Sequence, residues 1–154
     1  MGGSFGPGTN SMNGDRVFLD TNILVYAHDL DAGHKQTIAL RVIRELWEAR
    51  SGVLSVQVLQ EFYVTMTRGL KRPLTPTAVR EIIRDYGNWP VQMNDADSVL
   101  AASRIEEKYR LSFWDSLIIA AAVRAKAAKI LTEDLQSGQV IEGILIENPF
   151  LAAV

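Results

Sequence analysis

The sequence predicts an α/β domain, specifically a three-layer α/β/α sandwich with a mostly parallel central sheet. Three observations support this class. Short apolar runs typical of buried strands alternate with longer stretches of helical periodicity, as expected when each strand is followed by a crossover helix. No internal repeat, low-complexity tract or interdomain linker interrupts the alternation after Met12. The length of 154 residues suits one domain that buries a core.

The composition excludes several classes of protein. An apolar fraction of 47% with 22% charged residues is typical of a globular domain. No run of 18 apolar residues occurs, so no membrane span is expected. The absence of cysteine excludes disulfides, thiolate metal sites and a cysteine nucleophile, and it fits a cytoplasmic location. The net charge of −2 argues against binding nucleic acid through bulk positive charge, so such a partner needs a local basic strip or metal ions.

The first eleven residues, MGGSFGPGTNS, are rich in glycine and lack both apolar periodicity and the apolar core of a signal peptide. We interpret residues 1–11 as a cloning remnant or a disordered segment and exclude them from the fold. A single domain is assigned to residues 12–154.

The first half of this domain is expected to contain two strands and three helices. The apolar run Val17–Leu19 ends at a polar triplet, as a buried strand does. Helices are expected at 22–27 and 34–50, the second with apolar residues at helical spacing. Gly52 breaks that pattern, and a second strand at 53–55 runs into a helix that continues to about residue 68.

The second half begins with a basic loop at 69–73. Thr75 and Pro76 predict a helix start, because threonine caps helices and proline is favoured at the first helical position. Asn94 and Ser112 are expected to begin two further helices, with Asp97 as the capping-box acid of the first. The expected ranges are helices to about 86, 109 and 128, an extended piece at 89–91, and strands at 130–132 and 143–146.

Four carboxylates are candidates for a ligand site, and each of them also has an ordinary structural explanation. Asp20 follows the first strand, where it either caps the next helix or belongs to a ligand site. Asp115 fits a capping box, yet it opens a helix that is apolar nearly all round, so its carboxylate should be partly desolvated and need a partner. Glu61 alone fits a solvated helix face, and Asp134 alone fits a turn cap after a strand.

The order of these acids resembles that of the PIN-domain nucleases. The motifs that carry the resemblance are LDTN after the first strand, SVQVLQEFY after the second, LSFWDSLIIAAA opening a late helix, and ILTEDLQSGQ after the next strand. Together they cover the chain from about Arg16 to Phe150. The last motif is most similar to bacterial VapC-type toxins, the ribonuclease half of toxin–antitoxin pairs.

The resemblance implies an acidic, metal-binding catalytic site at Asp20, Glu61, Asp115 and Asp134. The accessory polar positions of the family fall on Thr21 or Asn22 and on Thr132. Glu133 stands beside Asp134, which leaves two candidates for the fourth acidic ligand.

Such a set of acids suits hydrolysis of a phosphodiester. Four converging carboxylates repel one another unless a cation is present. Oxygen ligands without nearby histidine or cysteine favour Mg²⁺ or Mn²⁺ over Zn²⁺. With two ions about 4 Å apart, one activates a water and the other stabilises the leaving oxygen. We expect one or two ions per site, with Asp20, Glu61 and Asp115 around the principal ion, Asp134 completing the site or binding a second ion, and Asn22 and Thr132 orienting the ligands.

Substrate contact requires cations, and the candidates are Arg68, Lys71 and Arg72 in the basic loop together with Arg110. The functional interpretation assigns them to RNA phosphates, and the alternative is an ordinary solvated loop. His28 and His34 could form a metal pair but fit ordinary polar surface better.

Other functions remain alternatives. A haloacid-dehalogenase-like phosphatase needs D-x-D after its first strand, and the second position here is Asn22. An inert PIN-fold interaction module and a housekeeping PIN nuclease without an antitoxin are the remaining candidates. The resemblance to VapC-type toxins implies RNA as substrate, a homodimer, and an antitoxin that blocks the acidic groove. The sequence does not locate the apolar patch expected for dimerisation, and Trp47, Trp89 and the apolar tail 150–154 are places to look for it.

Overall fold

A six-stranded sheet lies at the centre of the computed structural model, which describes residues 16–151. The strand order is β4-β3-β2-β5-β7-β6, and every neighbouring pair is parallel except β6 and β7. The strands are β2 (Val17–Leu19), β3 (Gly52–Ser55), β4 (Val91–Gln92), β5 (Lys129–Leu131), β6 (Val140–Ile141) and β7 (Ile144–Glu147). The predicted mostly parallel sheet is confirmed.

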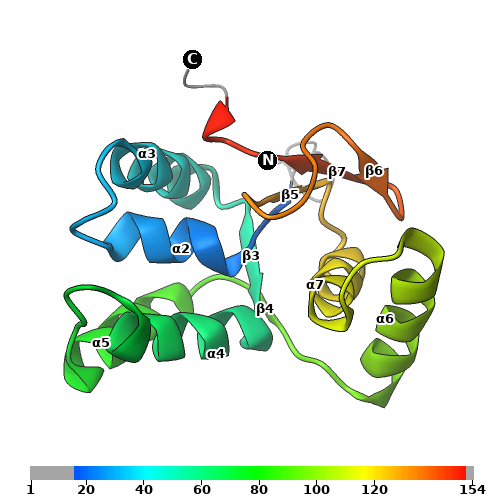
Figure 1. Cartoon of the computed structure of the whole chain (residues 1–154), viewed down its shortest axis with the longest axis horizontal. Helices are drawn as coiled ribbons and strands as arrows, with labels where there is room; N and C mark the ends of the chain where they lie inside the picture. The colour runs from blue at the N-terminus through cyan, green and yellow to red at the C-terminus, as the bar shows by residue number, and fades with distance from the viewer. Residues whose placement is uncertain (1–15, 152–154) are drawn as a thin grey trace, which may run out of the picture.

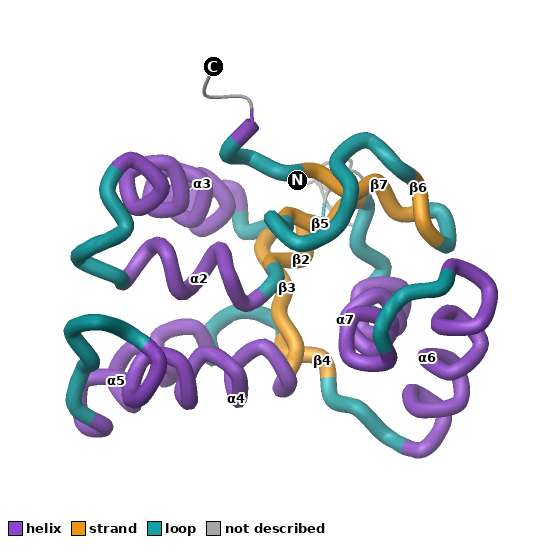
Figure 2. Tube along the Cα trace, viewed as in Figure 1, coloured by secondary structure: helices purple, strands orange, loops and turns teal. Residues whose placement is uncertain are grey.

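Helices cover both faces of this sheet. Figure 1 shows α2, α3, α4 and α5 on one side and α6 and α7 on the other, and Figure 2 shows the strands between these two layers. The helices are α2 (Thr21–His28), α3 (His34–Ala49), α4 (Val56–Val64), α5 (Pro76–Tyr86), α6 (Ala96–Tyr109) and α7 (Phe113–Arg124). The predicted three-layer α/β/α sandwich is therefore confirmed.

Side-chain caps set the beginnings of most of these helices. Asp20 caps α2 by accepting the Thr21 amide, and Ser112 caps α7 by accepting the Asp115 amide. The predicted cap at Thr75 with proline in the first turn is also present. The expectation for α6 was wrong, because Asp95 is its cap and forms the capping box with Ser98, whereas Asp97 only lies in the first turn.

The core is densest where β2, β3 and β5 meet the helices. Phe18, Leu19, Leu54 and Ile130 are fully buried. Helix α7 is buried over Ser116–Ala122, as its uniformly apolar sequence predicted. Because α7 is held on several sides, the acid in its first turn is fixed relative to the sheet.

Three features differ from the sequence-based expectations. Helix α4 ends at Val64 and continues as a short π-helix, Thr65–Gly69. Helix α7 ends at Arg124 rather than near Ala128. The last strand pairs with a further strand, β6, in an antiparallel hairpin. The sequence did not predict β6, because a strand of two residues is too short to show periodicity.

No helix within residues 16–151 is long and apolar enough to cross a membrane. The segment 1–11 that we interpreted as a cloning remnant or disordered, and the end of the apolar tail at 152–154, lie outside the described residues. Of the proposed dimer contacts, Trp47 is 42% exposed and Trp89 is buried against it, with ring centroids 5.4 Å apart.

Candidate functional site

The carboxyl ends of the parallel strands place most of the predicted site residues together. Asp20 directly follows β2 and Thr132 directly follows β5, and the Asp20 amide donates to the Leu131 carbonyl at 3.0 Å. The chain moves from β2 to β3 on one side and later returns to β5 on the other side, so the crevice at β2 is the topological switch point of the sheet. A hollow at this edge is lined by Thr21, Asn22, Val25, Tyr26, Glu61, Thr65 and Asp134.

Asp20 is the most deeply buried of the four acids. It is 6% exposed, and its two carboxylate oxygens accept from the Thr21 amide and from the Thr132 hydroxyl, each at 2.8 Å. The pKa of Asp20 is raised to about 6, chiefly by burial. The hydrogen bonds from Thr132 and Thr21 oppose this rise, and the negative charges of Asp134 and Glu61 add to it. Asp20 therefore both caps α2 and forms part of the acidic crevice.

Glu61 is held toward the crevice from two directions. The Thr21 hydroxyl donates to its Oε1 at 2.6 Å, and the Gln57 side-chain amide donates to its Oε2 at 3.2 Å. The same amide nitrogen donates to the Trp114 carbonyl at 3.3 Å, which connects α4 to the first turn of α7. The solvated-face interpretation of Glu61 is wrong, because the side chain is half-buried and hydrogen-bonded to α2.

Asp115 lies in the first turn of α7, one residue after Trp114. Its side chain is half-buried, and burial raises its pKa, with smaller contributions from the charges of Asp134 and Glu61. The partial desolvation predicted from the apolar helix is present. The charges of Asp134 and Glu61 raise the pKa of both Asp115 and Asp20, which places these acids near one another.

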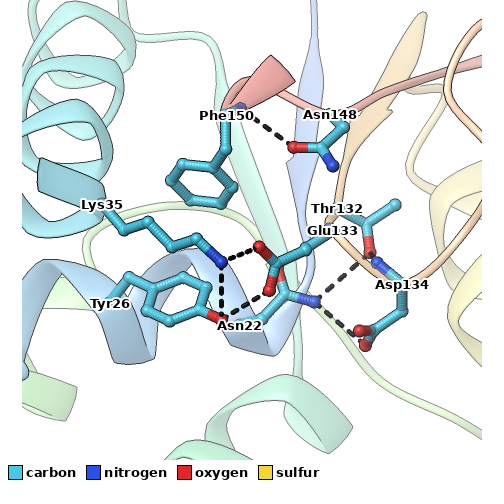
Figure 3. Close-up of polar contacts among 8 residues, drawn as sticks. All are labelled: Asn22, Tyr26, Lys35, Thr132, Glu133, Asp134, Asn148 and Phe150. Atoms are coloured by element: carbon cyan, nitrogen blue, oxygen red, sulfur yellow. Dashed lines mark hydrogen bonds and ion pairs between the residues drawn. The ribbon is translucent and has the colours of Figure 1, made fainter. Parts of the chain in front are cut away.

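The loop after β5 turns Glu133 and Asp134 in different directions (Figure 3). Asn22 donates to Asp134 Oδ2 at 3.0 Å and, through the same amide group, accepts from the Glu133 backbone N–H at 3.2 Å. The Glu133 carboxylate instead forms an ion pair with Lys35 and accepts from the Tyr26 hydroxyl. Of the two candidates for the fourth acid, Asp134 is the one that lines the hollow.

The charge of the four acids is not compensated by an ion pair in the part of the chain that the structure describes. Within residues 16–151, no lysine, arginine or histidine forms an ion pair with Asp20, Glu61, Asp115 or Asp134. In this same part of the chain, no three acidic, histidine or cysteine side chains already converge as a metal-ligand cluster. The donor set nonetheless fits a hard divalent cation, because it consists of oxygen ligands with uncompensated charge and Asp134 is exposed enough to turn.

The four basic residues predicted to contact RNA phosphates lie on different parts of the fold. Arg68 lies in the π-helix that follows the Glu61 helix, and Arg68 and Lys71 are both exposed. Arg72 is paired through two hydrogen bonds with Asp31. Arg110 ends α6 in a left-handed conformation.

The two histidines do not form a metal pair at this site. His28 Nε2 is hydrogen-bonded to the Tyr86 hydroxyl at 2.9 Å, and burial lowers the pKa of His28. His34 is exposed at the start of α3, and neither histidine lines the hollow.

Sequence reasoning missed Val25, which lines the hollow, and four polar residues of the site: Gln57, Tyr26, Thr65 and Lys35. Gln57 precedes Glu61 by one helical turn, so this spacing could have marked it as a partner. Thr65 lines the hollow where α4 passes into the π-helix, a backbone form that often occurs at functional sites. The partners Tyr26 and Lys35 are about 100 residues from Glu133 in sequence, and no local pattern connects them.

The fold and the site define an α/β domain with an acidic crevice at its switch point. The family model of the PIN domain matches residues 17–140. The chain belongs to the PIN-domain family. A comparison with curated protein sequences gives no significant match.

Solved structures with the same fold include a toxin–antitoxin complex from Klebsiella pneumoniae, with a TM-score of 0.63, 18% identity, and coverage of 86% of this chain and 97% of that chain. DNA-bound VapBC from Salmonella typhimurium has a TM-score of 0.62 and 18% identity, covering 88% and 98%. Mycobacterium tuberculosis VapC20, described as a toxin that cleaves the sarcin–ricin loop, has a TM-score of 0.55 and 18% identity, covering 74% and 86%. At this level of identity, the likeness concerns the fold.

Proposed function

We propose that this protein is a metal-dependent endoribonuclease and the toxin of a type II toxin–antitoxin pair. The observation that carries the proposal is the uncompensated acidic crevice, in which Asp20 is buried with its pKa raised to about 6 and is surrounded by further acids. A protein that bound nothing there would gain stability by replacing such a carboxylate, so a cationic ligand is the natural reason for its presence.

The ion is Mg²⁺ or Mn²⁺, one or two per site, held by Asp20, Glu61 and Asp115 with Asp134 completing the shell. When bound, such an ion lowers the pKa of a water molecule and offsets negative charge on the phosphate. The Thr132 hydroxyl orients Asp20, and the Asn22 side-chain amide orients Asp134. The hydrogen bonds between these pairs support the two roles. Thr21 does the same for Glu61.

The reaction is the attack of water on phosphorus, with departure of a ribose oxygen and no covalent enzyme intermediate. No serine, threonine or cysteine nucleophile is required, and the RNA 2′-hydroxyl takes no part. The products therefore contain no 2′,3′-cyclic phosphate. Arg68 in the π-helix and Lys71 in the loop after it contact RNA phosphates, whereas Arg72 must first leave Asp31 to do so.

The partner is a small antitoxin protein that occupies the acidic hollow. The fold likeness to toxin–antitoxin complexes from two bacteria supports this assignment. The likeness to VapC20, described as a toxin that cleaves the sarcin–ricin loop, supports the nuclease activity. A homodimer in the cytoplasm is part of the same proposal, with the exposed Trp47 as one place to search for its interface.

The proposal is tested by incubating the purified protein with cellular RNA in Mg²⁺, in Mn²⁺ and in EDTA, followed by analysis of the product ends. We expect cleavage with either ion, none in EDTA, and no cyclic phosphate ends. Cleavage that persists in EDTA or leaves cyclic phosphates contradicts the proposed chemistry. Growth arrest on expression, relieved by a small protein encoded beside the gene, tests the toxin assignment separately.

A further inference from the structure

Glu133 does not line the acidic hollow, and its carboxylate is bound by two side chains of α2 and α3. It forms an ion pair with Lys35 of α3, and it accepts from the Tyr26 hydroxyl of α2 (Figure 3). The two charged side chains are only 32% and 25% exposed.

An aromatic cover shields this ion pair. The ring of Phe150, which is 8% exposed, lies edge to face with Tyr26 at a centroid distance of 5.2 Å. The Lys35 ammonium lies 4.9 Å from the centre of the Tyr26 ring and 5.5 Å from that of Phe150. The Asn148 side-chain oxygen accepts from the Phe150 backbone N–H at 2.9 Å, and the Asn148 backbone N–H donates to the Ser137 hydroxyl at 3.0 Å. These two bonds connect the aromatic cover to the loop after β5. Shielding from water strengthens the pair relative to an exposed one.

On its other side the same loop carries Asp134. The Glu133 backbone N–H donates to Asn22 Oδ1, and Asn22 Nδ2 donates to Asp134 Oδ2. The Asp134 backbone N–H donates to the Thr132 hydroxyl at 3.0 Å, and that hydroxyl also bonds Asp20. A displacement of Glu133 therefore moves the Asn22 amide, which contacts Asp134 directly.

We infer that the Glu133–Lys35 pair is a positioning device that fixes the loop 132–134 so that Asp134 faces the metal site. The inference rests on the proposed function, because it takes Asp134 as a metal ligand. Glu133 and Lys35 touch neither the ion nor the RNA in this scheme. They act through the loop backbone and Asn22.

The substitution K35M distinguishes this positioning role from two alternatives, in which Glu133 is itself a metal ligand or the pair acts only through its charge. If Glu133 is itself a metal ligand, releasing it from Lys35 leaves ion affinity unchanged or increases it. If the pair acts only through its charge, removing a positive charge near the acids also tightens binding of a cation. If the pair positions Asp134, K35M weakens binding although the local charge becomes more negative.

The experiment is a calorimetric titration of Mn²⁺ into the metal-free protein without RNA. K35M and E133Q are each expected to raise the Mn²⁺ dissociation constant roughly tenfold or more, the usual effect of losing a residue that orients a ligand. K35R should restore most of the affinity. K108M is the matched control, because it removes an exposed ion pair between Lys108 on α6 and Glu142 in the turn between β6 and β7, and it should change nothing. Unchanged or tighter Mn²⁺ binding by K35M overturns the inference, as does a loss confined to E133Q.

A second measurement keeps this inference distinct from the proposed function. If the parent protein itself does not bind Mn²⁺, the proposed function fails, and hydrogen exchange of the Glu133 backbone amide in the metal-free protein then decides the positioning role. We expect faster exchange in K35M than in the parent and in K108M, together with shifted Asn22 side-chain amide signals. Equal exchange and unshifted signals overturn the role of the pair.

Discussion

Replacing Asp20 by asparagine should stabilise the metal-free protein at alkaline pH. The pKa of Asp20 is about 6 in the folded chain against an ordinary value of 3.8. The folded state thus binds this proton more tightly than the unfolded state does. The stability that Asp20 contributes is complete below pH 3.8 and is lost as the pH rises through about 6. The difference corresponds to roughly 3 kcal/mol at pH 8.

Asparagine removes the charge and keeps the size of the side chain. Its amide oxygen still accepts from the Thr21 N–H, and the Thr132 hydroxyl can turn to accept from the new amide nitrogen. We therefore expect D20N to unfold at a higher urea concentration than the parent at pH 8 in EDTA. The gain in the free energy of unfolding should be at most about 3 kcal/mol, reduced by the cost of the altered hydrogen bond. The gain should shrink strongly at pH 4.5.

The assay is urea unfolding of both proteins in EDTA at the two pH values, with D97N as control. Asp97 is exposed in the first turn of α6, so D97N should stay within about 0.5 kcal/mol of the parent. Adding Mn²⁺ should reverse the order, since the ion stabilises only the protein that retains its ligand. A D20N protein that is less stable than the parent at pH 8 in EDTA refutes the reasoning about the buried charge.

Three further outcomes are expected. T21V removes the 2.6 Å hydrogen bond to Glu61 and should weaken Mn²⁺ binding roughly tenfold by calorimetry with little change in fold; equal affinity contradicts the role of Thr21. G52A places a methyl group 2.6 Å from the Trp89 ring and should lower the free energy of unfolding by roughly 1–3 kcal/mol in urea, and an unchanged midpoint shows that the ring moves freely. R68Q/K71Q should reduce the slope of log RNA affinity against log salt by about 1.4 in total, measured by fluorescence anisotropy, and an unchanged slope assigns the phosphate contacts elsewhere.

Local rules were sufficient for the elements whose beginnings are set by a nearby side chain. Thr75 and Pro76 predicted the start of α5, and the uniformly apolar segment after Ser112 predicted a buried helix. The same rules failed at α6, where Asn94, Asp95 and Asp97 are all competent caps. In the structure Asp95 forms the capping box with Ser98 and also pairs with Arg124 of α7, a tertiary contact that has no local sequence signal.

The candidate site also contains residues that local sequence predicts and residues that only tertiary contacts identify. Asp20 and Asp115 could be predicted because each combines a strand end or an apolar helix with an isolated carboxylate. Glu61 was ambiguous because its hydrogen-bond partner, Thr21, lies 40 residues away in sequence. The choice between Glu133 and Asp134 depended on Lys35, nearly 100 residues away, which takes Glu133 out of the hollow. Contacts of this range arise from the packing of α2 and α3 and have no local sequence signal.

Cleavage of a labelled RNA by the parent and by D115N in Mg²⁺ tests the acidic site most directly. Among residues 16–151 the Asp115 carboxylate forms no ion pair, and asparagine keeps the backbone N–H that donates to Ser112, so D115N should fold normally. We predict that D115N loses at least roughly a hundredfold in cleavage rate while its urea midpoint stays at or above that of the parent. A folded D115N protein that cuts the RNA as fast as the parent contradicts the assignment of these acids to catalysis.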